Sequence, residues 1–310
     1  MPVEGLRVLY DGWSLAFAPN SPQALHLLAL LANLPPEVQP RVAVPAEPPD
    51  WVKALVPLHL HPTRPTPHLR LAWEQTQLPR LARALEMHVL HLPGSYAPLF
   101  SRRAVVAEAG AREASGGDFY SRLSTALAEG GLSRLSSPGA PGKLLWPADL
   151  PAPQGSDNLV KLHPLLHPAF TPERRPALES LETPDTFILY HGSLAAQDFS
   201  RVLDAWSWAA GTIGASHPLL VAGASPQQQA RLQDILAEHE QSATVRILPP
   251  LELYRLAALY RRCATFFHPL PATGWGGTDG VVNSIGLKIT NQLFATSVAG
   301  SSAEVWKNAA

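Results

Sequence analysis

The stretch FILYHGSL, Phe187–Leu194, together with the pattern that follows it, decides the fold of this chain. Phe187–Tyr190 is a short run of bulky apolar residues, which is typical of a strand buried on both faces. The run ends in Gly192-Ser193, and a helical pattern follows through Trp206. In an open parallel sheet such a strand–turn–helix junction lies at the carboxyl edge, where ligands bind. The free backbone N–H groups of the turn suit a phosphate.

The same alternation of strands and helices continues to Pro269. The pattern predicts three further strands and two further helices. The strands are expected at 218–223, 243–248 and 264–269, and the helices at 226–239 and 251–262. Four strands alternating with three helices predict a doubly wound α/β domain. Taken alone, Gly192 could simply be a turn glycine, because a fold does not fix a function.

Length and composition predict two globular domains without a nucleic-acid partner. The 310 residues exceed one average domain, and 46% hydrophobic residues are enough for two cores. The 24 basic and 25 acidic residues leave a net charge of -1, without the basic excess typical of nucleic-acid binding. The single cysteine, Cys263, excludes an internal disulfide and a cysteine-based zinc site, and we expect it in a core.

No stretch predicts a membrane span or a secretory signal. The longest apolar run, Leu25–Leu34, is interrupted by His26 and is shorter than the ~18 residues that a span needs. The first residues lack the apolar stretch of a signal peptide. We therefore expect a soluble cytoplasmic protein.

The 32 prolines cluster at 35–49, 57–79 and 138–184 and predict loops and linkers there. The last cluster predicts a domain boundary near 165–180, which gives an N-terminal domain of residues 1–170 and a C-terminal domain of residues 171–310. In the N-terminal half, apolar patterns predict strands at 6–10, 41–45 and 87–91. They also predict a helix that begins near Asn20-Ser21-Pro22 and another at 68–86, kinked at Pro79.

The C-terminal half resembles the donor-nucleotide domain of retaining glycosyltransferases with the two-domain GT-B architecture (glycosyl transferases group 1). The resemblance rests on the Gly192-Ser193 turn, the helix pattern Leu253–Tyr260 and the strand end Phe266–Pro269, in that order. It implies two Rossmann-like doubly wound domains that face a cleft. The C-terminal domain would be shortened at its C-terminus, so this chain resembles a degenerate or shortened member.

The N-terminal half resembles the acceptor-side domain of the same family. The matching segments are Trp73-Glu74-Gln75 with Leu78–Leu85, and the strand end Val89–His91. Lys161–Pro172 resembles the hinge segment that enters the second domain. The resemblance thus spans most of residues 6–269.

This resemblance implies transfer of a sugar from a nucleotide-sugar donor with retention, without a cofactor. It places the donor at the edge of the second sheet and the acceptor at the edge of the first. The expected donor-side residues are His191, Gly192, Ser193, Arg201, His268, Gly274, Trp275 and Asp279. The expected acceptor-side residues are His91, Ser95, Tyr96 and Glu108. No catalytic residue can be named.

Four sequence features that are usual in the family are missing from this chain, two on the donor side and two in the N-terminal domain. Leu194–Asp198, after the Gly-Ser turn, has no cation to neutralise a leaving diphosphate, and Arg201 lies one helical turn further on. The paired glutamates are absent, and Asp279, in a glycine-rich loop, is more often a turn residue. Glu108 replaces the acceptor His-Asp pair, and Ala18–Pro22 replaces a glycine-rich loop.

The twelve histidines predict no metal site. Three pairs lie close in sequence, but no carboxylate stands at a supporting spacing, and two histidines rarely make a site alone. The pairs are His59 with His61, His88 with His91, and His163 with His167. The chain also has no Ser-His-Asp set, Walker loop or dinucleotide fingerprint.

Three hypotheses stay open at this point. The first is an active retaining glycosyltransferase. The second is a pseudoenzyme, a catalytically inactive relative that binds or assembles with a partner glycosyltransferase or with a second copy of itself. The third is an unrelated doubly wound binding protein. The missing side chains favour the second hypothesis, whereas the resemblance as a whole favours the glycosyltransferase family.

Overall fold

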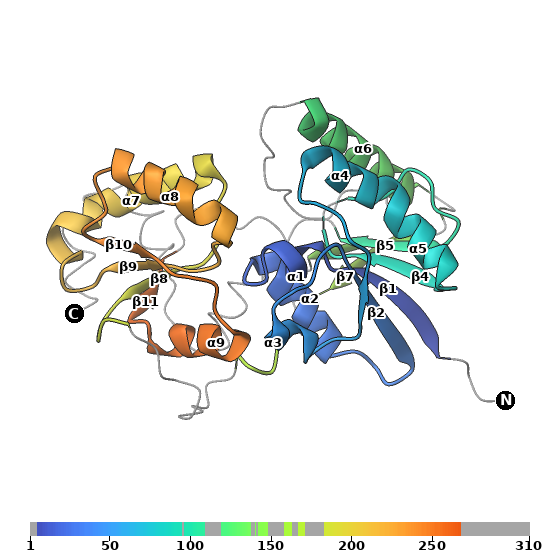
Figure 1. The fold of residues 1–310 in the computed structure, drawn as a ribbon, viewed down its shortest axis with the longest axis horizontal. Helices are drawn as coiled ribbons and strands as arrows, with labels where there is room; N and C mark the ends of the chain where they lie inside the picture. Colours follow the sequence, from blue (N-terminus) through green and yellow to red (C-terminus); the bar gives the residue numbers. More distant parts are fainter. Residues whose placement is uncertain are drawn as a thin grey trace. The chain divides into compact units, whose positions relative to one another are not determined.

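The structure, a computed structural model, describes residues 5–94, 96–108, 119–137, 140, 142–147, 158–162, 167–170 and 183–267. The chain forms two compact units, and within these residues the first ends at Pro168 and the second begins at Ala169. Each unit is built on one parallel sheet with helices on both faces (Figure 1). The predicted fold class, two Rossmann-like doubly wound α/β domains, is confirmed.

The first unit is built on seven parallel strands in the order β3-β2-β1-β4-β5-β6-β7. The strands are β1 (Leu6–Asp11), β2 (Val38–Val44), β3 (Leu58–Leu60), β4 (Val89–Leu92), β5 (Ala104–Glu108), β6 (Gly142–Pro147) and β7 (Leu159–Leu162). β1 pairs with β2 on one side and with β4 on the other, so the strand order reverses between β1 and β4. In a doubly wound sheet, the carboxyl ends at such a reversal form the ligand-binding crevice.

Among the described residues, helices cover both faces of this sheet (Figure 1). One face carries α2 (Pro22–Ala32) and α3 (Asp50–Lys53), and the other carries α4 (Pro67–Ala72), α5 (Leu78–Ala84) and α6 (Phe119–Ser136). α1 (Trp13–Phe17) follows the carboxyl end of β1, and its Trp13 packs with the core that α5 and α6 cover. The start of α2 is the one predicted: Ser21 Oγ accepts a hydrogen bond from Ala24 N at 3.2 Å, and Pro22 is the first helical residue.

The predicted long helix at 68–86 is divided by a π-helical turn, η1 (Trp73–Gln77), between α4 and α5. Pro79 is the second residue of α5, directly after this turn, and proline lacks an N–H and clashes with the carbonyl of the residue four before it. The wider turn gives room for the Pro79 ring. Trp73 and Glu74, which lie in this wider turn, are fully buried.

The three proline clusters, at 35–49, 57–79 and 138–184, were predicted as loops and linkers, and this prediction is wrong in part. The first contains β2 with Pro40 inside it, the second contains β3 and α4, and the third contains β6 and β7. Pro67 is the first residue of α4 and Pro147 is the last residue of β6. At the end of an element, the missing N–H of proline disturbs little. The short helices α1 and α3 and the long helix α6 were not predicted either.

The second unit contains four parallel strands in the order β10-β9-β8-β11. The strands are β8 (Ile188–Tyr190), β9 (Leu219–Val221), β10 (Val245–Ile247) and β11 (Thr265–Phe266). α7 (Ala196–Ile213) and α8 (Pro226–Glu238) lie on one face and α9 (Leu253–Arg262) lies on the other (Figure 1). All predicted strands and helices of this unit are present. The strand order reverses between β8 and β11.

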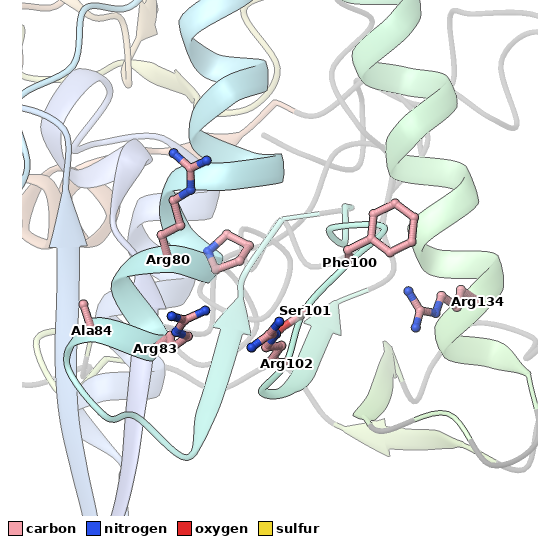
Figure 2. A pocket seen from close by; sticks show the side chains of 8 residues that line it. Arg80, Arg83, Ala84, Phe100, Ser101, Arg102 and Arg134 are labelled. Carbon is pink, nitrogen blue, oxygen red and sulfur yellow. The ribbon is translucent and has the colours of Figure 1, made fainter.

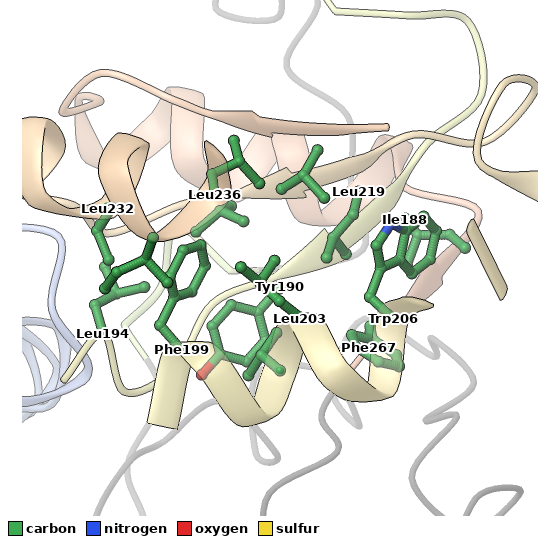
Figure 3. Close-up of a cluster of buried hydrophobic side chains, with 14 of the residues drawn as sticks. Ile188, Tyr190, Leu194, Phe199, Leu203, Trp206, Leu219, Leu232, Leu236 and Phe267 are labelled. Carbon is green, nitrogen blue, oxygen red and sulfur yellow. The ribbon is translucent and has the colours of Figure 1, made fainter. Parts of the chain in front are cut away.

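Aromatic side chains of α7 fill the core of the second unit (Figure 3). Phe199 and Trp206 pack against β8 and β9, and both are at most 1% exposed. Trp206 Nε1 also donates a hydrogen bond to Thr244 Oγ1 at 3.1 Å, so its polar atom is satisfied. This core fixes the start of α7 relative to the end of β8.

Cys263 is buried next to α9, as predicted for a core residue. Burial raises the pKa of its thiol to about 12, so the side chain is a neutral thiol at pH 7. A buried, neutral thiol of this kind is a poor nucleophile.

Every helix that the structure describes is too short or too polar to span a membrane.

A glycine allows α6 to approach the rest of the first unit closely. A Cβ atom at Gly131 would overlap the carbonyl oxygen of Ala97, whereas one at Gly211 of α7 would meet no atom within 4 Å. We expect Gly131→Ala to lower the free energy of unfolding by roughly 2 kcal/mol, because the helix must move outward. Gly211→Ala should instead raise it by about 0.5–1 kcal/mol. Denaturant unfolding measures both changes, and equal effects would contradict this contact.

Candidate functional site

The turn after β8 lies at the strand reversal of the second sheet, and two tyrosines hold it. Tyr190 Oη donates a hydrogen bond to the carbonyl oxygen of Ser193 at 2.7 Å. His191 Nδ1 lies 2.6 Å from Tyr260 Oη, and the His191 side chain is fully buried. A Cβ atom on Gly192 would lie 2.9 Å from Tyr190 Oη. The side chains of Tyr190 and Tyr260 therefore support the turn from within the domain, where His191 and Gly192 are buried and Ser193 is partly exposed.

The first turn of α7 carries a carboxylate beside the Gly-Ser turn. Ser193 Oγ donates a hydrogen bond to Asp198 Oδ2 at 2.7 Å. Arg201 Nη1 lies 3.9 Å from Asp198 Oδ1, and the Arg201 side chain is 59% exposed. The structure thus brings together the Ser193 hydroxyl, the Asp198 carboxylate and the guanidinium of Arg201, and two of these residues, Ser193 and Arg201, were predicted site residues.

The amino-terminal end of α7 differs from that of α8, which covers the same face. Ser225 and Gln228 close α8 with a reciprocal capping box. α7 begins after Ala195, and no side chain caps its backbone N–H groups in the described structure. Four N–H groups at a helix start have no partner within the helix, and together with the helix dipole they attract anions.

Five predicted site residues lie outside the described residues. They are Ser95 on the acceptor side and His268, Gly274, Trp275 and Asp279 on the donor side.

Asp11, the last residue of β1, is the centre of a buried hydrogen-bond network at the reversal of the first sheet. Its Oδ1 accepts a hydrogen bond from Trp73 Nε1 at 2.7 Å and another from the backbone N of Trp13 at 3.1 Å. Its Oδ2 accepts one from Tyr96 Oη at 2.6 Å. Burial and the Asp11 carboxylate raise the pKa of Tyr96 well above its ordinary value, so the phenol stays protonated and donates.

Arg70 connects Asp11 to a second buried carboxylate. Arg70 Nε donates to Glu74 Oε1 at 2.5 Å, and Arg70 Nη2 lies 3.6 Å from Asp11 Oδ2. The guanidinium carbon lies 4.6 Å from the ring centroid of Trp13 and 5.4 Å from that of Tyr96. Arg70 is thus held by charge and by aromatic faces.

Glu108 ends β5 and lies between two histidines. Its Oε1 lies 2.9 Å from His91 Nε2, and its Oε2 lies 2.9 Å from His26 Nε2 of α2. The Glu108 side chain is fully buried, whereas that of His91 is 10% exposed. Burial alone would raise the pKa of Glu108, but the two histidines outweigh it and lower the pKa to about 2. Glu108 is therefore ionised at neutral pH.

The ring of Tyr10 packs beside this cluster, 5.0 Å from the ring of His91 between centroids. Burial and the negative charge of Glu108 raise the pKa of Tyr10 to about 12. His91, Glu108 and Tyr96, three of the four predicted acceptor-side residues, thus lie at the carboxyl edge of the first sheet. Tyr96 and Glu108 are inside the domain, and His91 retains a small exposed area.

Four residues of these networks were missed as site candidates from the sequence. Asp11 had a signal, because it directly follows a predicted strand. His26 had a weaker one, because it interrupts an apolar helix. Glu74 had one too, because it belongs to the Trp73-Glu74-Gln75 segment of the family resemblance, whereas Arg70 had no signal beyond its place in a helix.

In the described part of the chain, no group of three or more His, Cys, Asp or Glu side chains is arranged to hold a metal ion. The Glu108 cluster pairs each imidazole with one carboxylate oxygen.

No family model matches the chain, and no curated protein matches it by sequence. Solved structures match its fold. One is Anabaena Alr3699/HepE in complex with UDP and glucose, 10% identical, with 98% of this chain and 92% of that chain covered and a TM-score of 0.59. Another is WaaG, a glycosyltransferase involved in lipopolysaccharide biosynthesis, 13% identical, with 95% and 85% covered and a TM-score of 0.57.

A glycosyltransferase from Rickettsia africae ESF-5 is 12% identical, with 93% and 79% covered and a TM-score of 0.51. Such low identities show the fold alone. The chain has the GT-B type of fold, as predicted, and the likeness covers most of its length.

Proposed function

We propose that this chain is a glycosyltransferase-like protein that binds a nucleotide-activated sugar. The donor would bind in the domain of residues 171–310 and the acceptor in the domain of residues 1–170. The observation that carries this proposal is the His191–Ser193 turn, which lies at a strand reversal beside the uncapped start of α7. The likeness to HepE, which was solved with UDP and glucose, supports it.

The backbone of the turn suits the diphosphate of such a donor. Gly192 adds no side chain, and the first N–H groups of α7 have no side-chain cap in the described structure. A diphosphate placed there would accept hydrogen bonds from these groups and gain from the helix dipole. Arg201, 3.9 Å from Asp198, is the nearest cation of this segment and would turn from the carboxylate to the phosphate.

In the proposed reaction, the bond between the anomeric carbon and the diphosphate oxygen breaks, and the diphosphate leaves with the electron pair. An acceptor hydroxyl oxygen bonds to the anomeric carbon on the same face, and its proton leaves with a base. His91 is the predicted acceptor-side residue with an exposed part, and Glu108 fixes its ring. An imidazole held by a carboxylate is suited to accept a proton.

Retention, the absence of a cofactor and a cytoplasmic location stay predictions from the sequence.

One observation favours the second candidate function, an inactive relative that assembles with a partner glycosyltransferase or with a second copy of this chain. Asp198 accepts a hydrogen bond from Ser193 and places a negative charge in the first turn of α7. This charge repels a diphosphate at the proposed position. The acidic residue thus weakens donor binding and favours a protein with another role.

Calorimetric titration with UDP-, GDP- and ADP-sugars, together with an assay for released nucleoside diphosphate, separates the two functions. Micromolar binding with transfer or hydrolysis supports the transferase. Binding of none of the donors contradicts it and leaves the inactive relative.

Asp198→Asn is expected to bind the donor roughly tenfold more tightly than the wild type, because it removes a charge next to the diphosphate. Asp204→Asn, further along α7 and 70% exposed, should not change the affinity. Equal affinities of the wild type and Asp198→Asn would reject this position for the diphosphate. Gly192→Val is a poor test, because its side chain would strike Tyr190 and disturb the turn.

A further inference from the structure

The first unit carries an arginine-lined hollow that the proposed reaction does not use. Its volume is about 770 Å³, and its walls come from α5, the loop 99–103 before β5, and α6. α5 leads into β4 and the loop leads into β5, so the hollow lies at the amino edge of the sheet. Asp11 and Glu108 lie at the opposite, carboxyl edge. The hollow is therefore separate from the candidate site.

Four arginines line the hollow, and Figure 2 shows that the guanidinium group of Arg80 points away from those of the other three. Arg80 and Arg83 come from α5, Arg102 from the loop and Arg134 from α6, and all four are exposed. No acidic residue lines the hollow, and none of the four arginines pairs with a carboxylate among the described residues. Exposed like charges repel one another when they lie closer together than about one Debye length, which is about 10 Å at 0.1 M salt.

The helix dipoles account for the positions of at most two of these arginines. Arg83 and Arg134 lie in the last turns of α5 and α6, where a cation is favourable. Arg80 and Arg102 have no such reason to be there. Arg134 Nη1 also donates a hydrogen bond to the carbonyl oxygen of Leu99, so one guanidinium is held in place. Three guanidinium groups around one concave space, with Arg80 at its wall, indicate an anionic ligand.

An exposed aromatic ring lies at the same hollow. Phe100 is 79% exposed, and the guanidinium carbon of Arg134 lies 5.7 Å from its ring centroid. Guanidinium groups bind phosphoryl oxygens through paired, charge-assisted hydrogen bonds. We propose that this hollow is a binding site for a phosphoryl anion, supplied either by a free phosphate compound or by the headgroup of an anionic lipid.

The first test measures binding of inorganic diphosphate by calorimetry and by thermal unfolding. The wild type should bind, and its Tm should rise by about 4 °C at a diphosphate concentration ten times Kd. The double variant Arg83→Gln/Arg102→Gln should bind at this hollow roughly tenfold more weakly. Arg41→Gln/Arg231→Gln, two exposed arginines elsewhere, is the control with the same change of charge.

The comparison of these two double variants separates the hollow from the donor site, because neither touches the His191–Ser193 turn. Without diphosphate, the Arg83→Gln/Arg102→Gln protein should unfold within about 3 °C of the wild type, because the relief of like-charge repulsion and the loss of the favourable cation at the end of α5 oppose each other. A larger fall in Tm would indicate a structural role of these arginines and would overturn the proposal.

The second test distinguishes the two sources of the anion. Sedimentation is measured with vesicles of zwitterionic lipid alone and with vesicles that contain an anionic phospholipid. If a lipid headgroup is the ligand, only the anionic vesicles bind, and Phe100→Ser and Arg83→Gln/Arg102→Gln both reduce binding. If a free phosphate compound is the ligand, diphosphate binds, anionic vesicles do not, and Phe100→Ser has no effect. Binding of neither diphosphate nor vesicles, or binding unchanged in Arg83→Gln/Arg102→Gln, overturns the proposal.

Discussion

Glu108→Gln is expected to lower the free energy of unfolding by about 3 kcal/mol at pH 7. The carboxylate is fully buried, and His26 and His91 each lie 2.9 Å from one of its oxygens. The histidines lower the pKa of Glu108 from 4.5 to about 2. An amide keeps the size of the side chain but loses the charge, so both imidazoles lose the carboxylate oxygen beside them. Urea unfolding at pH 7 measures the loss.

The pH dependence of this difference provides the control. Because the pKa of Glu108 is lower in the folded state, its stabilisation is present above about pH 5 and is lost as the pH falls from about 4.5 towards 2. The wild type and Glu108→Gln should therefore differ most near pH 7 and least near pH 2. Glu129→Gln, an exposed position on α6, should match the wild type throughout. A difference that is constant with pH would show that Glu108 acts through packing alone.

Asp11→Ala is expected to cost about 4 kcal/mol of unfolding free energy, because several buried groups lose one shared acceptor. Trp73 Nε1, Tyr96 Oη and the backbone N of Trp13 all donate to this carboxylate. Asp50→Ala, at a carboxylate that is 96% exposed, is the matched control and should cost less than about 1 kcal/mol. Unfolding in guanidinium, followed by tryptophan fluorescence, measures both.

A double-mutant cycle makes this prediction more specific. Asp11→Ala and Tyr96→Phe should together cost at least about 1 kcal/mol less than the sum of the single changes, since both remove the same 2.6 Å hydrogen bond. Additive costs would mean that the two side chains do not interact in solution.

The fold of the second unit could be predicted from its sequence because its elements are short and well separated. Phe187–Tyr190 is bulky and apolar, Gly192 ends it, and Ser225-Pro226 begins the next helix. Each signal is local, and each element lies where it was predicted. In the first unit, Pro147 suggested a loop, although it is the last residue of β6. A proline pattern does not distinguish the end of a strand from a linker.

For the candidate site, the sequence predicted the position of the backbone turn but not the contacts of the side chains. The Gly192-Ser193 turn followed from the strand–turn–helix pattern, but the hydrogen bond from Ser193 to Asp198 depends on side-chain directions that no pattern contains. Asp11 and Tyr96 are 85 residues apart, and they meet only because β1 pairs with β4. The partners of Glu108 likewise depend on the strand order and on the face that α2 covers.

The central position of β1 has a consequence for synthesis of the chain. β1 is made before β4, and Val8 pairs with Val89 of β4, so one edge of β1 stays open until about 80 more residues have been added. At 5–20 residues per second this takes roughly 4–16 s. During that time the open edge can pair with another nascent chain. The open edge of β1 is thus an aggregation hazard on the ribosome until β4 emerges, and a chaperone that holds extended apolar segments would protect it during that time.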